Sequence, residues 1–144
     1  MRLVARLQGF DRLSLVTKKL TTAAQQGLQF GVSEAGLILE TAAKENVPVL
    51  TGNLRDHIHT ELMESTAERQ VVAVTPAYDE PNKYGFDPAY ARRIEYGFEG
   101  ADSLGRVYHQ PAQPYMRPAW DEHKDEAVQA IKDSVLEEVR AAHQ

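Results

Sequence analysis

The fold is decided by two turn-rich stretches, VPVLTGNLR at residues 47–55 and AQPYMRPA at residues 112–119. Each lies at the edge of a long helical pattern. Pro48 ends the first pattern, because it disfavours helix in the residue before it and lacks an amide donor. Pro118 pre-sets the first turn of the second helix. Such rigid turns fix how two helices enter and leave a small sheet, which indicates assembly rather than a reactive pocket.

The pattern before the first stretch predicts an amphipathic helix over residues 11–45. Apolar or small residues recur there at steps of three and four, at Leu13, Val16, Leu20, Ala24, Gly27, Gly31, Ala35, Ile38 and Ala42. Gly27 and Gly31 lie one turn apart on this stripe, and each costs about 1 kcal/mol of helix propensity relative to Ala. Something must therefore approach closely. We expect a bend or a tight crossing over the domain's own sheet, with contact to a neighbouring subunit as the alternative.

A second helix is predicted from Pro118 to the C-terminus. Its buried stripe consists of Val128, Ile131, Val135, Val139 and Ala142. Trp120 shares the first turn with this face, so we expect it to anchor the core, with an interface hot spot as the alternative.

Between the helices, alternation over residues 57–63 predicts a strand, and β-branched residues at 69–75 predict its antiparallel partner, which ends at Pro76. Residues 90–97 predict two turns of helix ended by Gly97. Residues 98–113 are expected to be irregular, with a possible third strand at 106–109. The expected fold class is α+β: a long N-terminal helix and a C-terminal helix packed on one face of a small antiparallel β-sheet, with two long irregular loops.

The other irregular loop, residues 76–89, contains three prolines and the aromatic residues Tyr78, Tyr84 and Phe86. Loops of this length are usually functional or disordered, and aromatic side chains offer large contact area at low entropic cost. We expect this loop to protrude and contact a partner. Aromatic side chains folded back onto their own domain are the alternative.

Composition limits the class of protein. The 144 residues are the usual length of one domain, and the absence of cysteine excludes disulfides and thiolate metal sites. No apolar run approaches the roughly 20 residues that span a bilayer, so we expect a soluble protein made in the cytoplasm. A net charge of -5, with scattered basic residues, disfavours a general nucleic-acid binder.

The best argument for an enzyme is the alternation of His57, His59 and Glu61, which could gather zinc ligands on one strand face. The second interpretation is therefore a small metal-dependent hydrolase. No HExxH, G-x-S-x-G or phosphate-binding glycine motif accompanies it, and exposed strand faces are polar in any case. We assign no catalytic residue and no cofactor.

Three charged residues are expected to form ion pairs. Glu95 is expected to pair with an arginine of its own chain or of a neighbour, with a catalytic acid as the weaker alternative. Arg55 and Arg117 follow the two rigid turns, and their planar guanidinium groups suit a carboxylate partner.

Three blocks, PVLTGNLR at 48–55, YARRIEYG at 90–97 and QPYMRPA at 113–119, resemble in order and character the small neck proteins of long-tailed bacteriophages, the tail-completion group that includes minor tail protein Z. The resemblance covers roughly residues 10–140. The chain departs from the family pattern at Phe98, where a small hydroxyl residue is more usual, and in its longer 76–89 loop.

The resemblance implies a non-enzymatic virion protein with one domain over residues 1–144, of which 1–10 form a possible flexible arm. It implies a hexameric ring at the neck, assembled in the host cytoplasm, which completes the tail and joins it to the head connector and to the tail terminator or tube proteins. Genomic DNA would pass through without sequence-specific binding, and no membrane is involved. An acidic channel wall suits this passage because it does not bind DNA. A cytoplasmic protein-binding adaptor is a further alternative.

We predict that the loops, turns and helix ends supply the contacts between subunits and with partners. These residues are Thr51, Gly52, Asn53, Arg55, Tyr78, Tyr84, Phe86, Arg92, Glu95, Tyr96, Tyr115 and Arg117.

Overall fold

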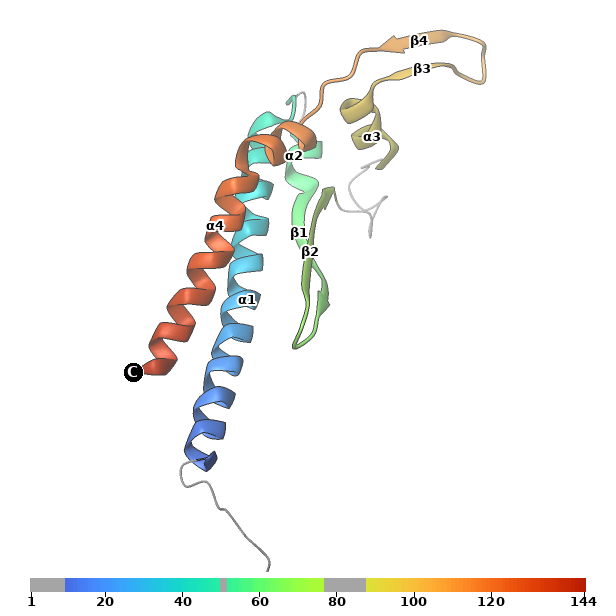
Figure 1. Ribbon diagram of the computed structural model, residues 1–144. Helices are drawn as coiled ribbons and strands as arrows, with labels where there is room; N and C mark the ends of the chain where they lie inside the picture. Colours follow the sequence, from blue (N-terminus) through green and yellow to red (C-terminus); the bar gives the residue numbers. More distant parts are fainter. Residues whose placement is uncertain (1–9, 50–51, 77–87) are drawn as a thin grey trace, which may run out of the picture.

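The computed structural model describes residues 10–49, 52–76 and 88–144 (Figure 1). In chain order the elements are α1 (Phe10–Asn46), α2 (Asn53–His57), β1 (Ile58–Ser65), β2 (Gln70–Pro76), α3 (Pro88–Tyr96), β3 (Phe98–Ala101), β4 (Val107–Gln110) and α4 (Met116–His143). The predicted α+β class is confirmed, as are both long helices. None of the helices in these ranges is long and apolar enough to cross a membrane.

The two long helices α1 and α4 lie side by side (Figure 1). Their closest approach is at two glycines of α1. A Cβ atom on Gly27 would lie 2.6 Å from Val135 Cα, and one on Gly31 would lie 2.7 Å from Ile131 Cα. The predicted close approach is confirmed, but α4 and not the sheet makes it.

The hairpin of β1 and β2 packs against α1. Its strands are antiparallel, with Ile58 opposite Pro76 and Ser65 opposite Gln70. Gly36 of α1 allows the contact, because a Cβ there would lie 2.5 Å from Thr60 Cγ2. This role of Gly36 was not predicted from the sequence.

One carboxylate of α1 fixes the position of β1. Glu40 Oε2 accepts hydrogen bonds from the backbone N–H and the hydroxyl of Thr60 at 2.8 and 2.9 Å, and Oε1 accepts one from Lys44 Nζ at 2.6 Å. Burial alone would raise the pKa of Glu40. The hydrogen bonds from Lys44 and Thr60, together with the Lys44 charge, outweigh burial and lower the pKa below its usual 4.5.

Two expectations for the strands were wrong. His57 does not begin β1, because it is the last residue of α2 and its Nδ1 lies 2.7 Å from the Asn53 backbone oxygen, one helical turn back. The expected third strand exists as β4, but it pairs with β3 and not with the first hairpin. Much of the stretch expected to be irregular, residues 98–113, is therefore a second β-hairpin.

The core lies at one end of the helix pair. Its buried cluster consists of Ala42, Ala43, Val47, Leu54, Ile58, Ala91, Ile94, Tyr115 and Ala119. The prediction that Trp120 anchors this core was wrong. Trp120 is 52% exposed, because its neighbour Ala119 takes the inward position in the first turn of α4.

Candidate assembly surfaces

The three sequence blocks that carry the family resemblance meet in the core. Leu54 comes from the first block, Ile94 from the second, and Tyr115 and Ala119 from the third, and all four belong to the same buried cluster. These blocks therefore build a junction among α2, α3 and the start of α4.

Glu95 joins α3 to α4 within this junction. Its carboxylate is buried and accepts hydrogen bonds from the backbone N–H groups of Tyr115, Met116 and Arg117, at 2.7, 3.0 and 3.1 Å. These amides begin α4 and have no partner within the helix. The expected pairing of Glu95 with an arginine is thus replaced by capping of a helix N-terminus, where a negative charge is stabilised.

Gly97 fixes the chain that leaves α3. Its φ of 78° is left-handed, and its N–H donates to Arg93 O at 2.8 Å, as expected for the residue after a helix. A Cβ on Gly97 would lie 2.9 Å from Ala112 N and from Gln110 O. The Gln113 N–H also donates to Ile94 O at 2.7 Å. The two ends of the second hairpin are therefore held together at the junction.

The second hairpin, residues 98–110, extends from the junction and is called the arm below. In Figure 1 it points away from the helix pair, with β3 and β4 beside one another. Leu104 is 75% exposed and Val107 is 81% exposed, and Tyr108 is also exposed. Sequence reasoning missed these residues because the exposure of Leu104 in a turn, and of Val107 and Tyr108 in a short strand, depends on how the hairpin lies relative to the rest of the fold.

The tip of the arm, residues 102–106, is organised by one aspartate. Asp102 Oδ1 accepts hydrogen bonds from the Leu104 and Arg106 N–H groups, both at 2.9 Å, and Oδ2 accepts from Arg106 Nε at 2.7 Å. The backbone N–H of Arg106 is the main cause that lowers the pKa of Asp102. Gly105 supplies the left-handed φ of 76° that the turn needs. The tip is therefore a preformed turn.

An apolar groove of about 440 Å³ lies where β2 meets α1 and α4. Ala35 and Gly36 belong to its floor, Val72 to the strand side, and Trp120 and Val128 to the α4 side. Trp120 and Val128 are exposed large apolar side chains. Gln70 also lines the groove, and its Oε1 atom is buried without a hydrogen-bond partner in the described part of the chain.

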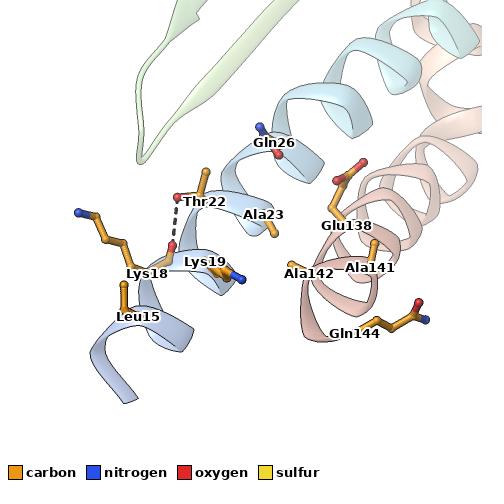
Figure 2. A pocket seen from close by; sticks show the side chains of 10 residues that line it. All are labelled: Leu15, Lys18, Lys19, Thr22, Ala23, Gln26, Glu138, Ala141, Ala142 and Gln144. Carbon is orange, nitrogen blue, oxygen red and sulfur yellow. Dashed lines mark hydrogen bonds between the residues drawn. The ribbon is translucent and has the colours of Figure 1, made fainter. Parts of the chain in front are cut away.

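A second groove, of about 660 Å³, lies between the first turns of α1 and the last turns of α4. Figure 2 shows Ala23 and Ala142 facing the space between the helices, with Lys18 and Leu15 on the α1 side. Leu13, Leu15 and Val16 are exposed on these turns, which extend beyond the end of α4 in Figure 1. The predicted apolar stripe of α1 is therefore not covered at this end by the described part of the chain.

The predicted contact residues divide into three groups. Tyr96, Arg55, Arg92 and Arg117 are exposed. Gly52, Glu95 and Tyr115 are buried, and Asn53 is half-buried as the first residue of α2. Glu95 and Tyr115 therefore hold their own chain together. Thr51, Tyr78, Tyr84 and Phe86 lie outside the described residues.

Arg55 lies on the surface beside its neighbour in α2. Its Nε is 3.1 Å from Asp56 Oδ1, and both side chains are largely exposed. Such a surface pair contributes little to stability.

The metal-ligand interpretation finds no support in the described residues, where no group of three His, Cys, Asp or Glu side chains is placed to hold a metal ion. The expected strand alternation fails because His57 belongs to α2. His59 Nδ1 lies 3.1 Å from the His57 backbone oxygen, and Glu61 is exposed.

Comparison with known protein families assigns most of the chain to a phage family. Residues 11–97 match the family model described as "Bacteriophage HK97-gp10, putative tail-component". The matched region includes α1, the first hairpin and α3, and thus two of the three sequence blocks. Neither the curated proteins nor the solved structures gave a match.

Proposed function

The chain belongs to the HK97-gp10-like family of bacteriophage tail components, and from this premise we propose that six copies form a ring at the head-tail joint. Membership of this family of putative tail components supports a structural role in the phage tail. The proposal adds that the ring completes the tail, contacts the head connector and the tail terminator or tube proteins, and lets the genome pass through its centre.

The distribution of apolar side chains is the observation that supports the proposal most. The largest fully buried side chains are only Tyr115 and Ile58 within the described residues, while many large apolar side chains are exposed. Several of them lie on the first turns of α1, on the arm and around the apolar groove, at Leu15, Val16, Leu104, Val107 and Trp120. Exposed apolar patches of this kind mark surfaces that are buried in an assembly.

The arm gives a second reason to expect assembly. An isolated two-stranded hairpin is marginally stable in water, and this one packs on little of its own chain. Contact with another molecule would bury its exposed face and its unpaired strand edges. A projecting surface of one subunit that docks on a different surface of the next produces a closed ring when the rotations between neighbouring subunits add up to a full turn.

The charge of the chain suits a subunit of a ring through which DNA slides. The chain carries a net charge of -5, and a negatively charged channel wall repels the phosphate backbone. Sequence-specific binding is not needed for the passage of DNA. Helix α4 has no cluster of basic residues that would bind DNA, since it contains seven Asp and Glu and four Lys and Arg.

A phage with a nonsense codon in the gene for this protein tests the proposal. We expect electron microscopy of the lysate to show full heads and separate tails, and complementation with the wild-type chain to restore joined particles. Native mass spectrometry of complexes released from wild-type particles should give six copies per ring. Joined, infectious particles without the protein would overturn the proposal.

A further inference from the structure

We propose that the tip of the arm of one copy docks into the apolar groove of the next copy in the ring. This inference rests on the proposed function and names the contact that would close the ring. The two surfaces occur once in each chain and differ from one another, so the contact is head-to-tail.

The tip has the properties of an inserted contact. It presents Leu104, and Val107 follows the tip directly as the first residue of β4; these are the two most exposed large apolar side chains of the described residues. Asp102 holds the turn behind them through bonds to two backbone N–H groups and to Arg106 Nε. A turn that is already ordered loses little conformational entropy on docking, so its apolar burial is not offset by an ordering cost.

The groove has the complementary properties. Val72, Trp120 and Val128 give it apolar walls, and Trp120 is a residue type that is enriched among binding hot spots. Apolar cavities hold water poorly, which favours an apolar occupant. The exposed half of Trp120 would be buried by such an occupant.

One polar atom in the groove also indicates an occupant. Gln70 Oε1 is buried and lacks a hydrogen-bond donor in the described part of the chain, while the amide nitrogen of the same side chain donates to Thr66 O at 2.7 Å. An unsatisfied buried acceptor is costly, so it takes a donor from outside the chain, either a water molecule or a group of the docked copy. The tip brings donors of its own, in the Ser103 hydroxyl and the guanidinium of Arg106.

The tip is not placed to fill the groove of its own chain. The arm leaves the junction away from the helix pair, and the groove lies beside β2, α1 and α4 (Figure 1).

Paired cysteines test the contact, and the absence of native cysteine makes the result simple to interpret. The test variant combines Leu104→Cys with Val128→Cys. The matched control combines Leu104→Cys with Leu136→Cys, since Leu136 lies on α4 with 49% exposure, close to the 44% of Val128, but outside the groove. A disulfide forms only when the two Cα atoms lie within about 7 Å, so a cross-link reports direct contact.

Mild oxidation of particles that contain each variant should give different products on a non-reducing gel. We expect the test variant to shift from the monomer band to a ladder that ends at the ring number, and the control to remain monomeric or dimeric. A tip that meets another tip would give dimers only, in both variants, and would overturn the contact. Absence of cross-links in the test variant, as when a tail protein occupies the groove, would also overturn it.

These outcomes are separable from failure of the proposed function. Six-copy rings that do not cross-link between residues 104 and 128 would contradict the docking of the tip and leave the ring intact as a proposal. Particles that join heads to tails without this protein would contradict both. Circular dichroism of the purified variants should match the wild type, because all three substituted positions are exposed.

Discussion

Glu95 stabilises the start of α4 although it precedes Tyr115 by twenty residues in the sequence. Tyr115, the residue at the N-cap position, makes no capping hydrogen bond with its side chain. The Glu95 carboxylate accepts the bonds that a Ser or Asp cap usually accepts, and its charge also interacts favourably with the helix dipole. Because it comes from α3, this cap also locks the arm to the helix pair.

We predict that Glu95→Ala lowers the free energy of unfolding by roughly 3 kcal/mol, since it leaves three N–H groups without their charged acceptor. Glu95→Gln should lose less, because one amide oxygen remains to accept a bond. Urea denaturation of the purified chain measures both. The control is Glu99→Ala, whose side chain is 78% exposed and should contribute close to nothing. Equal losses for the two alanine variants would contradict the capping role.

Residue roles at the junction could be predicted only in part. The sequence indicates that Glu95 is paired, but a cap formed across twenty residues depends on the tertiary fold and has no local signature. Tyr115 and Trp120 show the same limit. Both are aromatic residues near the start of α4. Ala119, four residues after Tyr115, lies on the same buried side, whereas Trp120 is one position further along and is exposed.

Among the elements, the pairing of α1 with α4 depends on small residues. Gly27→Ala and Gly31→Ala should each gain up to about 1 kcal/mol in helix propensity but lose more through overpacking, because the added Cβ meets backbone atoms of Val135 or Ile131. We expect a net loss of roughly 2 kcal/mol for each variant, visible as a lower melting temperature by circular dichroism. Ser33→Ala, at an exposed position of α1, is the control and should not lose stability. A melting temperature unchanged by Gly27→Ala would contradict the close crossing.

The contact between α1 and β1 should depend on pH through Glu40. Its pKa is lowered in the folded chain, so its contribution to stability is fully present above its usual pKa of 4.5 and is lost as the pH falls through the folded value. Glu40→Gln should therefore cost roughly 1–2 kcal/mol at pH 7, where bonds to a charged acceptor are lost, and much less at pH 3.

Denaturation of the wild type and of Glu40→Gln at pH 7, 5, 4 and 3 measures this difference. Glu61→Gln, an exposed position on the same strand, should leave the pH profile of the wild type unchanged. If the difference between wild type and Glu40→Gln stays constant over this range, Glu40 does not anchor the hairpin through its charge.

Long elements were predictable and their arrangement was less so. The periodicity of α1 and α4 and the alternation of the first hairpin have clear sequence signatures, and the three are confirmed. The spacing of a small-residue stripe does not show which element packs against it. The close contact at the glycines of α1 was therefore assigned to the sheet and not to α4. Of the arm, only its second strand was expected, at residues 106–109; β3 was missed because strands of four residues are too short for alternation to show.

At the scale of the whole molecule, charge is unevenly shared between the two long helices. α1 carries four Asp and Glu and four Lys and Arg, whereas α4 carries seven and four. Four exposed carboxylates of α4, those of Glu122, Asp125, Asp133 and Glu137, recur at helical spacing and share one face. If the chain forms the proposed ring, this face is the best candidate for the acidic channel wall.

Neutralising that face should slow the passage of DNA. We predict that particles with Glu122→Gln, Asp125→Asn, Asp133→Asn and Glu137→Gln eject their genome more slowly than the wild type, because a neutral wall no longer repels phosphate. The difference should shrink as salt rises, since screening weakens the repulsion that the wild type retains. Fluorescence of a dye that binds released DNA follows the kinetics. Particles with Glu61→Gln, Glu68→Gln, Glu99→Gln and Glu45→Gln change the net charge equally at exposed positions outside α4, and their ejection should match the wild type. Ejection rates that are equal in all three kinds of particle would remove α4 from the channel wall.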